Sequence, residues 1–87
     1  MALILRANDK REDITPLGKN GTLTLEQMQE VVGYVQVVKV PYSNNVLLVD
    51  EEGLLNKKQI NMQASILAQM PIVGDAIICI QMNEEFI

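Results

Sequence analysis

The fold is decided by residues 23–38, LTLEQMQEVVGYVQVV, which hold a helix start, a helix stop and the beginning of a strand. Thr24 is a favoured N-cap residue, and Gln27, three positions later, is the partner that completes a capping box. Gly33 stands where a helix commonly ends in a left-handed cap. The stretch therefore predicts a helix over residues 25–32, followed directly by a strand.

Strands are predicted on both sides of this helix, because apolar and β-branched runs are bounded by turn residues. They cover residues 2–7, 34–40, 46–50 and 76–82. Polar residues 8–13 predict a turn, after which residues 14–17 complete a first hairpin. The strands over 34–40 and 46–50 form the clearest hairpin. Both are apolar at successive positions, which indicates either a central place in the sheet or a second face covered by a partner chain.

A second helix is predicted between the acidic turn that follows residue 49 and Pro71, and it has two competing starts. Asn56 is one candidate N-cap, with Gln59 as its capping-box partner. Asn61 is the other candidate, and it accompanies an apolar stripe formed by Ile60, Ala64, Leu67 and Ala68. The sequence leaves both starts open.

These elements predict a single α+β domain over residues 1–87, with a mainly antiparallel sheet of four to five strands and two helices packed on one face. A chain of 87 residues is near the lower size at which one core is stable without disulfides or metal. The small size and the aliphatic hairpin together lead us to expect a symmetric homo-oligomer.

Composition excludes several classes of function. The chain has no histidine, so His-based acid–base catalysis, Ser-His-Asp triads and His-ligated zinc sites are ruled out. The net charge is -4 and the seven basic residues are scattered, which argues against binding of duplex nucleic acid. No apolar run is long enough to cross a bilayer. We therefore expect a protein that is not an enzyme, carries no cofactor and does not bind a membrane.

Other reactive or charged groups have simpler explanations than catalysis. Cys79, the one cysteine, lies in an apolar run, so we expect it to be buried and the protein to reside in a reducing cytoplasm. Residues 18–22, GKNGT, lack the spacing of a phosphate-binding loop and predict a turn. The acidic residues 50–52 lack the spacing of a calcium loop. We therefore predict no metal site.

The start of the second helix is the one place where the sequence offers a binding site. If Asn56 is the cap, Lys57 and Lys58 occupy the first helical positions, where the helix dipole disfavours cations. A bound anion would relieve that conflict, and Asn61 offers a donor and an acceptor to a base or ribose. The candidate ligand-binding residues are therefore Lys57, Lys58 and Asn61. If the helix starts at Asn61 instead, both lysines lie in an exposed turn and Asn61 is an ordinary N-cap.

Four segments carry a resemblance to a known family: residues 25–34 (LEQMQEVVGY), 48–53 (LVDEEG), 61–64 (NMQA) and 72–76 (IVGDA). In order and spacing they resemble an uncharacterised family of small proteins carried by bacteriophages and plasmids. The resemblance covers about residues 23–80. It implies an accessory protein of a mobile element, inside a bacterial host cell, and brings no established activity with it.

Two functions follow as hypotheses. The first is a non-catalytic accessory protein that counters host defence by binding and sequestering a small anionic, nucleotide-like signal at Lys57, Lys58 and Asn61. The second is a protein-interaction module that docks on a host enzyme through its exposed aliphatic surface or its acidic turn, without a ligand pocket.

Overall fold

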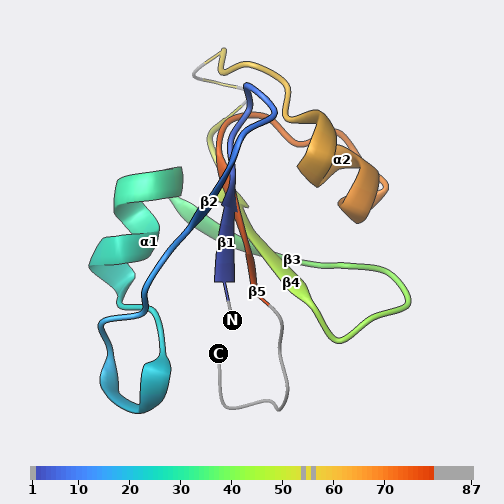
Figure 1. Ribbon diagram of the computed structural model, residues 1–87. Coiled ribbons are helices and arrows are strands. Elements are labelled where there is room, and N and C mark those ends of the chain that lie inside the picture. Colours follow the sequence, from blue (N-terminus) through green and yellow to red (C-terminus); the bar gives the residue numbers. More distant parts are fainter. Residues whose placement is uncertain (1, 54, 56, 80–87) are drawn as a thin grey trace.

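The computed structural model describes residues 2–53, 55 and 57–79 (Figure 1). The strands are β1 (Ala2–Leu5), β2 (Arg11–Asp13), β3 (Val35–Lys39), β4 (Val46–Asp50) and β5 (Ala76–Cys79); the helices are α1 (Leu25–Val32), α2 (Met62–Ala68) and a 3-10 turn over Lys19–Gly21. Within these residues the five strands form one sheet of order β2-β1-β5-β4-β3, and all neighbours are antiparallel. The predicted α+β class and antiparallel sheet are confirmed. No helix in this part of the chain is long and apolar enough to cross a membrane.

Helix α1 forms as its local sequence predicts, over residues 25–32. The Thr24 hydroxyl accepts a hydrogen bond from Gln27 N, and the Gln27 side chain accepts one from Thr24 N, so the capping box is complete. The Gln27 amide also accepts from Leu17 N and donates to Thr15 O, which ties the preceding segment to the helix. At the other end, Gly33 takes φ 92° and ψ -116°, a conformation suited to glycine but not the left-handed cap that was predicted.

The strands follow the predicted runs with shorter bounds, except in the first hairpin. The predicted strand 76–82 begins as β5, and its residues 80–82 lie outside the described residues. The partner of β1 is β2, which comes from the polar run predicted as a turn, and not residues 14–17. The chain reverses over residues 6–10, where Asp9, at φ 70°, allows a tight turn. The hydrogen bond from Arg6 N to Lys10 O closes this turn at 2.8 Å.

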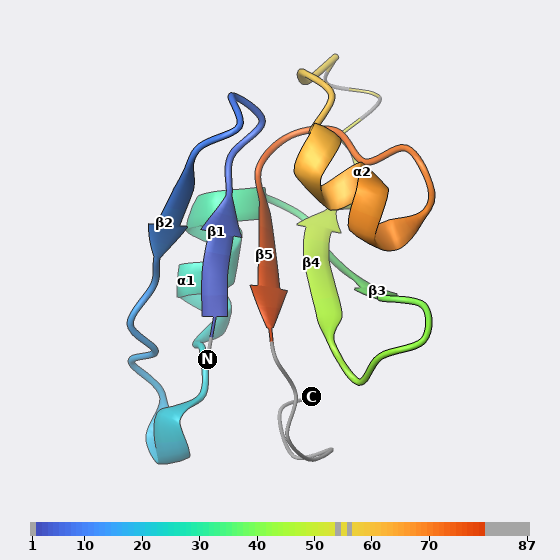
Figure 2. The same cartoon turned by 45° about the vertical axis from the view of Figure 1, so that its right-hand side comes forward.

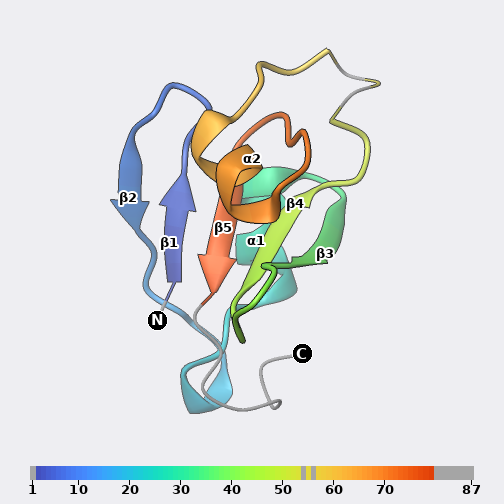
Figure 3. The same cartoon turned by 90° about the vertical axis from the view of Figure 1, so that its right-hand side faces the viewer.

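The two helices lie on opposite faces of the sheet, so the prediction that both pack on one face is wrong (Figures 1 and 2). One core cluster joins α1 to one face, and its side chains include Val32, Ile4, Leu48 and Ile77. The second joins α2 to the other face, and its side chains include Ala64, Ala68, Leu5, Leu47 and Ala76. Successive residues of a strand point to opposite faces, so a run that is apolar at every position needs cover on both sides. Figure 3 shows α2 in front of the sheet and α1 behind it.

The two strands of the central hairpin differ in their place in the sheet. β4 is an inner strand and is buried along its whole length, as its successive apolar residues predict. β3 is an edge strand, so the prediction of a central place is wrong for it. Its Val35 packs against the α1 cluster and its Val38 against the α2 cluster, while Val37 is exposed.

Candidate functional site

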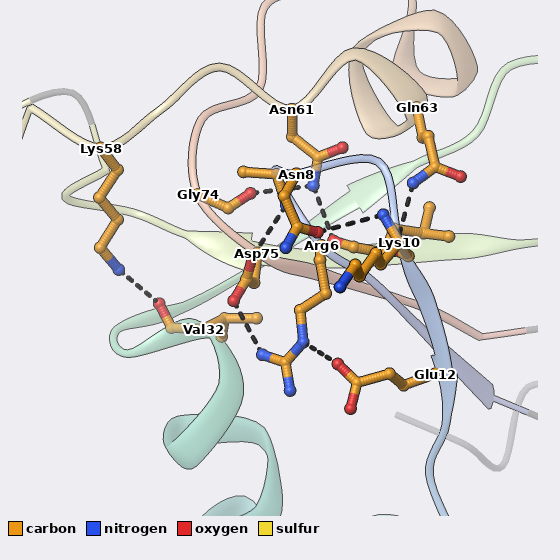
Figure 4. Close-up of polar contacts among 12 residues, drawn as sticks. Arg6, Asn8, Lys10, Glu12, Val32, Lys58, Asn61, Gln63, Gly74 and Asp75 are labelled. Atoms are coloured by element: carbon orange, nitrogen blue, oxygen red, sulfur yellow. Dashed lines mark hydrogen bonds and ion pairs between the residues drawn. The ribbon is translucent and has the colours of Figure 1, made fainter.

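Asn61 lies at the start of α2 and is fully buried. Its Oδ1 accepts a hydrogen bond from Ala64 N at 3.1 Å, so Asn61 is the N-cap and the alternative start at Asn56 is wrong. Its Nδ2 donates to Leu5 O at 2.7 Å and to Gly74 O at 2.9 Å (Figure 4). The amide therefore makes its hydrogen bonds inside the protein, through Nδ2 and through Oδ1. They join the end of β1 and the residue Gly74, just before β5, to the start of α2.

Lys58 is partly exposed and forms an ion pair with a buried carboxylate. Its Nζ lies 2.5 Å from Asp50 Oδ2 and 3.4 Å from Val32 O, the last residue of α1. Asp50 Oδ1 accepts a hydrogen bond from Glu52 N at 2.9 Å. Burial by itself raises the pKa of the Asp50 carboxyl, but the hydrogen bonds from Lys58 and Glu52 N outweigh it and hold that pKa below its ordinary value. Lys58 therefore neutralises a buried carboxylate and ties the end of α1 to the end of β4.

The three residues predicted as a ligand site are not brought together as one. Lys57 is exposed in a turn at φ 53°, Lys58 is ion-paired, and Asn61 is buried. Because α2 begins at Met62, neither lysine lies in its first turn. The conflict with the helix dipole that suggested an anion therefore does not arise.

A second polar cluster joins β1, β2 and the start of β5. Arg6 Nη1 lies 2.8 Å from Asp75 Oδ2, Arg6 Nε donates to Glu12, and Ala7 N donates to Asp75 Oδ1 at 2.9 Å (Figure 4). The hydrogen bond from Arg6 lowers the pKa of the Glu12 carboxyl. No sequence signal pointed to this cluster, because Arg6 and Asp75 are 69 positions apart. Its charges are satisfied by one another.

Metal and thiol chemistry have little support in this geometry. In the described ranges, no group of three or more His, Cys, Asp or Glu side chains is placed to hold a metal ion. Cys79 is buried, as predicted, and burial raises the pKa of its thiol to about 11. Since the thiolate is the reactive form, Cys79 is inert at neutral pH.

A shallow groove lies between the β3 edge and the segment that follows α2. It has a volume of about 130 Å³ and a mainly apolar lining. The lining residues are Gln36, Val38, Val49, Asp50, Glu51, Met70, Pro71, Ile72 and Val73. Among them, Glu51 is an exposed carboxylate that follows β4 directly.

The outer side of α2 carries a line of exposed apolar side chains. Met62 and Ile66 of α2 and Met70 just beyond it are spaced four residues apart, and they are 52%, 70% and 49% exposed. Side chains four residues apart in a helix lie one above another, as Met62 and Ile66 do in α2. Met70 follows the left-handed C-cap Gln69 and lines the groove. We call these three side chains and the groove together the α2 surface. Sequence reasoning found only the inward stripe of α2, although the outward repeat was visible in the sequence.

Comparison with known proteins identifies a domain family but no individual related protein. A family model described as a domain of unknown function (DUF3846) matches residues 1–87, the whole chain. No curated protein and no solved structure matches the chain significantly. An uncharacterised domain family is thus shown, and the match extends beyond the residues 23–80 to which the resemblance was assigned.

Proposed function

The chain belongs to the DUF3846 family, and we propose that it is a non-catalytic protein-interaction module that docks on a partner protein through its α2 surface. The observation that carries the proposal is the exposure of the apolar side chains of Met62, Ile66 and Met70, the last of which also lines the groove. Large contiguous apolar patches on a protein surface mark interaction sites. Methionine suits such a surface because its flexible, polarizable side chain adapts to the shape of a partner.

The size of the groove favours a protein partner over a small molecule. Ligand pockets typically hold roughly 300–1,000 Å³, whereas a cavity of roughly 150 Å³ accepts a single benzene ring. A groove of about 130 Å³ therefore fits one large apolar side chain. The exposed carboxylate of Glu51 in its lining favours a basic residue beside that side chain. The expected partner segment has a large apolar residue next to Lys or Arg.

The setting of this interaction rests on the sequence resemblance. It supports an accessory protein of a phage or plasmid that acts in the cytoplasm of a bacterial host, so that the partner is a host protein. Sequestration of a small anionic, nucleotide-like signal is the alternative. It has less support, because Lys58 and Asn61 of its predicted site are engaged inside the protein.

The test is to pan a random peptide library against the immobilised full chain, with Ile66→Glu and Leu25→Glu as matched baits. Both positions are exposed and apolar, and Leu25, 57% exposed, lies on α1 at the other face of the sheet. Exposed substitutions change stability by roughly 0.5 kcal/mol at most, so both variants should fold. We expect the wild type and Leu25→Glu to enrich peptides with a large apolar residue beside Lys or Arg, and Ile66→Glu to lose them.

The same variants identify a genuine partner. A protein captured from a bacterial lysate must rebind, after purification, to the wild type and to Leu25→Glu but not to Ile66→Glu. Peptides that bind all three baits equally contradict docking at the α2 surface. A melting temperature that rises with a nucleotide, in the absence of any enriched peptide, supports sequestration instead.

A further inference from the structure

The outer side of β3 is an open edge, since no strand of the described residues pairs with it. Two hydrogen bonds fix which backbone groups face β4: Glu51 N donates to Tyr34 O at 2.7 Å, and Val40 N donates to Asn45 O at 3.1 Å. Residues of antiparallel strands alternate between bonded and non-bonded pairs, so positions 34, 36, 38 and 40 bond to β4. The N–H and C=O groups that point outward are those of Val35, Val37 and Lys39.

The two edge strands of the sheet differ in how strongly they discourage pairing with another chain. β2, at one edge, consists of Arg11, Glu12 and Asp13, which are all charged and exposed. Short, charged edge strands discourage pairing with another chain. β3, at the other edge, carries one charge, on Lys39, and its Val37 is 42% exposed. Only the β3 edge therefore offers an apolar template for a further strand.

We propose that β3 pairs with β3 of a second copy of this chain, antiparallel, about a two-fold axis at Val37. This register places Val37 opposite Val37 of the second copy and Val35 opposite its Lys39. It is the register in which all the outward-facing residues of β3 find a partner within β3 itself. Each of them then exchanges its backbone hydrogen bonds with the residue opposite. The two sheets become one continuous sheet, and the interface is isologous, as in most homodimers.

The charges of β3 favour this register. The two Lys39 residues lie at opposite ends of the paired strands, about 14 Å apart at a rise of 3.4 Å per residue, which exceeds the screening length in physiological salt. Each Lys39 faces an apolar residue, Val35, and not another cation. A register with Lys39 opposite Lys39 would set like charges against each other, which is destabilising. Self-pairing therefore selects Val37 as the centre.

The pairing has a consequence for the α2 surface. A two-fold axis perpendicular to the sheet keeps both α2 helices on the same face. Gln36 and Val38, which line the groove, stand opposite each other across the axis. The two grooves therefore meet in one trough. The dimer does not depend on the proposed docking function, but it would present a partner with two α2 surfaces.

The oligomeric state tests the proposal. Sedimentation equilibrium of the full chain over a wide range of concentrations should give a dimer that dissociates on dilution. Val37→Lys places two ammonium groups opposite each other at the axis and should give a monomer at every concentration. Leu25→Lys, at an exposed position on α1, is the matched control and should remain a dimer. Circular dichroism melting shows that each variant is folded.

Cross-linking tests the register independently. With a short bis-maleimide reagent, Val37→Cys should cross-link to a second copy, whereas Lys39→Cys should not, because the two thiols are too far apart. The wild type should not react, because Cys79 is buried. A wild type that is a monomer at high concentration, a dimer that survives Val37→Lys, or equal cross-linking at both positions would overturn the proposal. A monomeric Val37→Lys that still binds the enriched peptides would leave the docking function intact.

Discussion

The buried amide of Asn61 organises three segments of the chain. It caps α2 through Oδ1 and bridges the carbonyl oxygens of Leu5 and Gly74 through Nδ2. A buried carbonyl that loses its partner costs about 1–3 kcal/mol, and a lost N-cap costs about 0.5–2 kcal/mol. The Asn61 side chain therefore has a structural role, and its hydrogen-bonding groups are engaged inside the protein rather than with a ligand.

We predict that Asn61→Ala lowers the free energy of unfolding by about 2–4 kcal/mol, because it removes the cap and the two hydrogen bonds that the amide donates to Leu5 O and Gly74 O. Asn61→Ser keeps a cap acceptor but lacks the amide donors, so its stability should lie between those of the wild type and Asn61→Ala. Urea unfolding followed by circular dichroism measures both. An alanine variant as stable as the wild type would show that the three hydrogen bonds contribute nothing.

The Asp50–Lys58 pair makes the free energy of unfolding depend on pH in the acid range. The folded protein lowers the pKa of Asp50 below the value of about 3.9 of an unfolded chain, so the stabilisation is present above that pH. It is lost as the pH falls through the lowered folded-state pKa. We predict that Asp50→Asn makes the acid slope of the unfolding free energy shallower than in the wild type. Some slope should remain, because the pKa of Glu12 is lowered as well.

The matched control for this experiment is Glu51→Gln, at the neighbouring exposed position. It removes the same charge without touching the buried pair, so its acid slope should follow that of the wild type. Unfolding in urea at a series of pH values from neutral to acid gives the slopes. Equal slopes for Asp50→Asn and the wild type would mean that Lys58 does not hold the carboxylate ionised.

Helix α1 ends at Gly33, which lies against a fixed carboxylate. Gly33 has φ 92°, and an added Cβ would stand 3.3 Å from Asp50 Oδ2. Asp50 cannot easily retreat, since Lys58 and Glu52 N hold it. Gly21 has a similar φ of 72°, but an added Cβ there would meet nothing within 4 Å.

The two glycines differ both in backbone conformation and in surroundings. We predict that Gly21→Ala costs about 1 kcal/mol of unfolding free energy through strain alone. Gly33→Ala should cost about 1–3 kcal/mol more, because ψ is -116° at Gly33, outside the left-handed region, and because the added Cβ crowds the Asp50 carboxylate. Thermal unfolding of both variants checks the difference. Equal costs would mean that neither the conformation of Gly33 nor its contact with Asp50 restricts the residue at that position.

Elements with local signals were predicted well, and elements fixed by distant contacts were not. The ends of α1 follow from Thr24, Gln27 and Gly33, which are close in sequence, and its bounds were predicted correctly. The start of α2 was ambiguous because both candidate caps satisfy local rules, and the hydrogen bond from Ala64 N to Asn61 Oδ1 decides between them. β2 was missed because its polar residues form a strand through pairing with β1. Of the candidate site, Asn61 was predicted as a ligand-binding residue and as one of two possible caps, and its contacts to distant carbonyls were not predicted.

The arrangement of layers follows from runs that are apolar at every position. β4 has buried residues along its whole length, and neighbouring residues face α1 and α2 in turn. A sheet with both helices on one face would leave half of these side chains in water. The apolar run of β4 therefore indicates a sheet covered on both faces, and α1 and α2 of the same chain supply the two covers.

The adjacent residues Leu47 and Leu48 test this three-layer arrangement in solution. Leu47 is buried in the α2 cluster and Leu48 in the α1 cluster. We predict that Leu47→Ala and Leu48→Ala each lower the unfolding free energy by about 2–5 kcal/mol, because each leaves a cavity under its own helix. Val37→Ala, at the exposed edge, should cost much less. Two helices on one face would make one of the two leucine variants nearly neutral, so urea unfolding at low protein concentration, where β3 pairing does not contribute, decides between the arrangements.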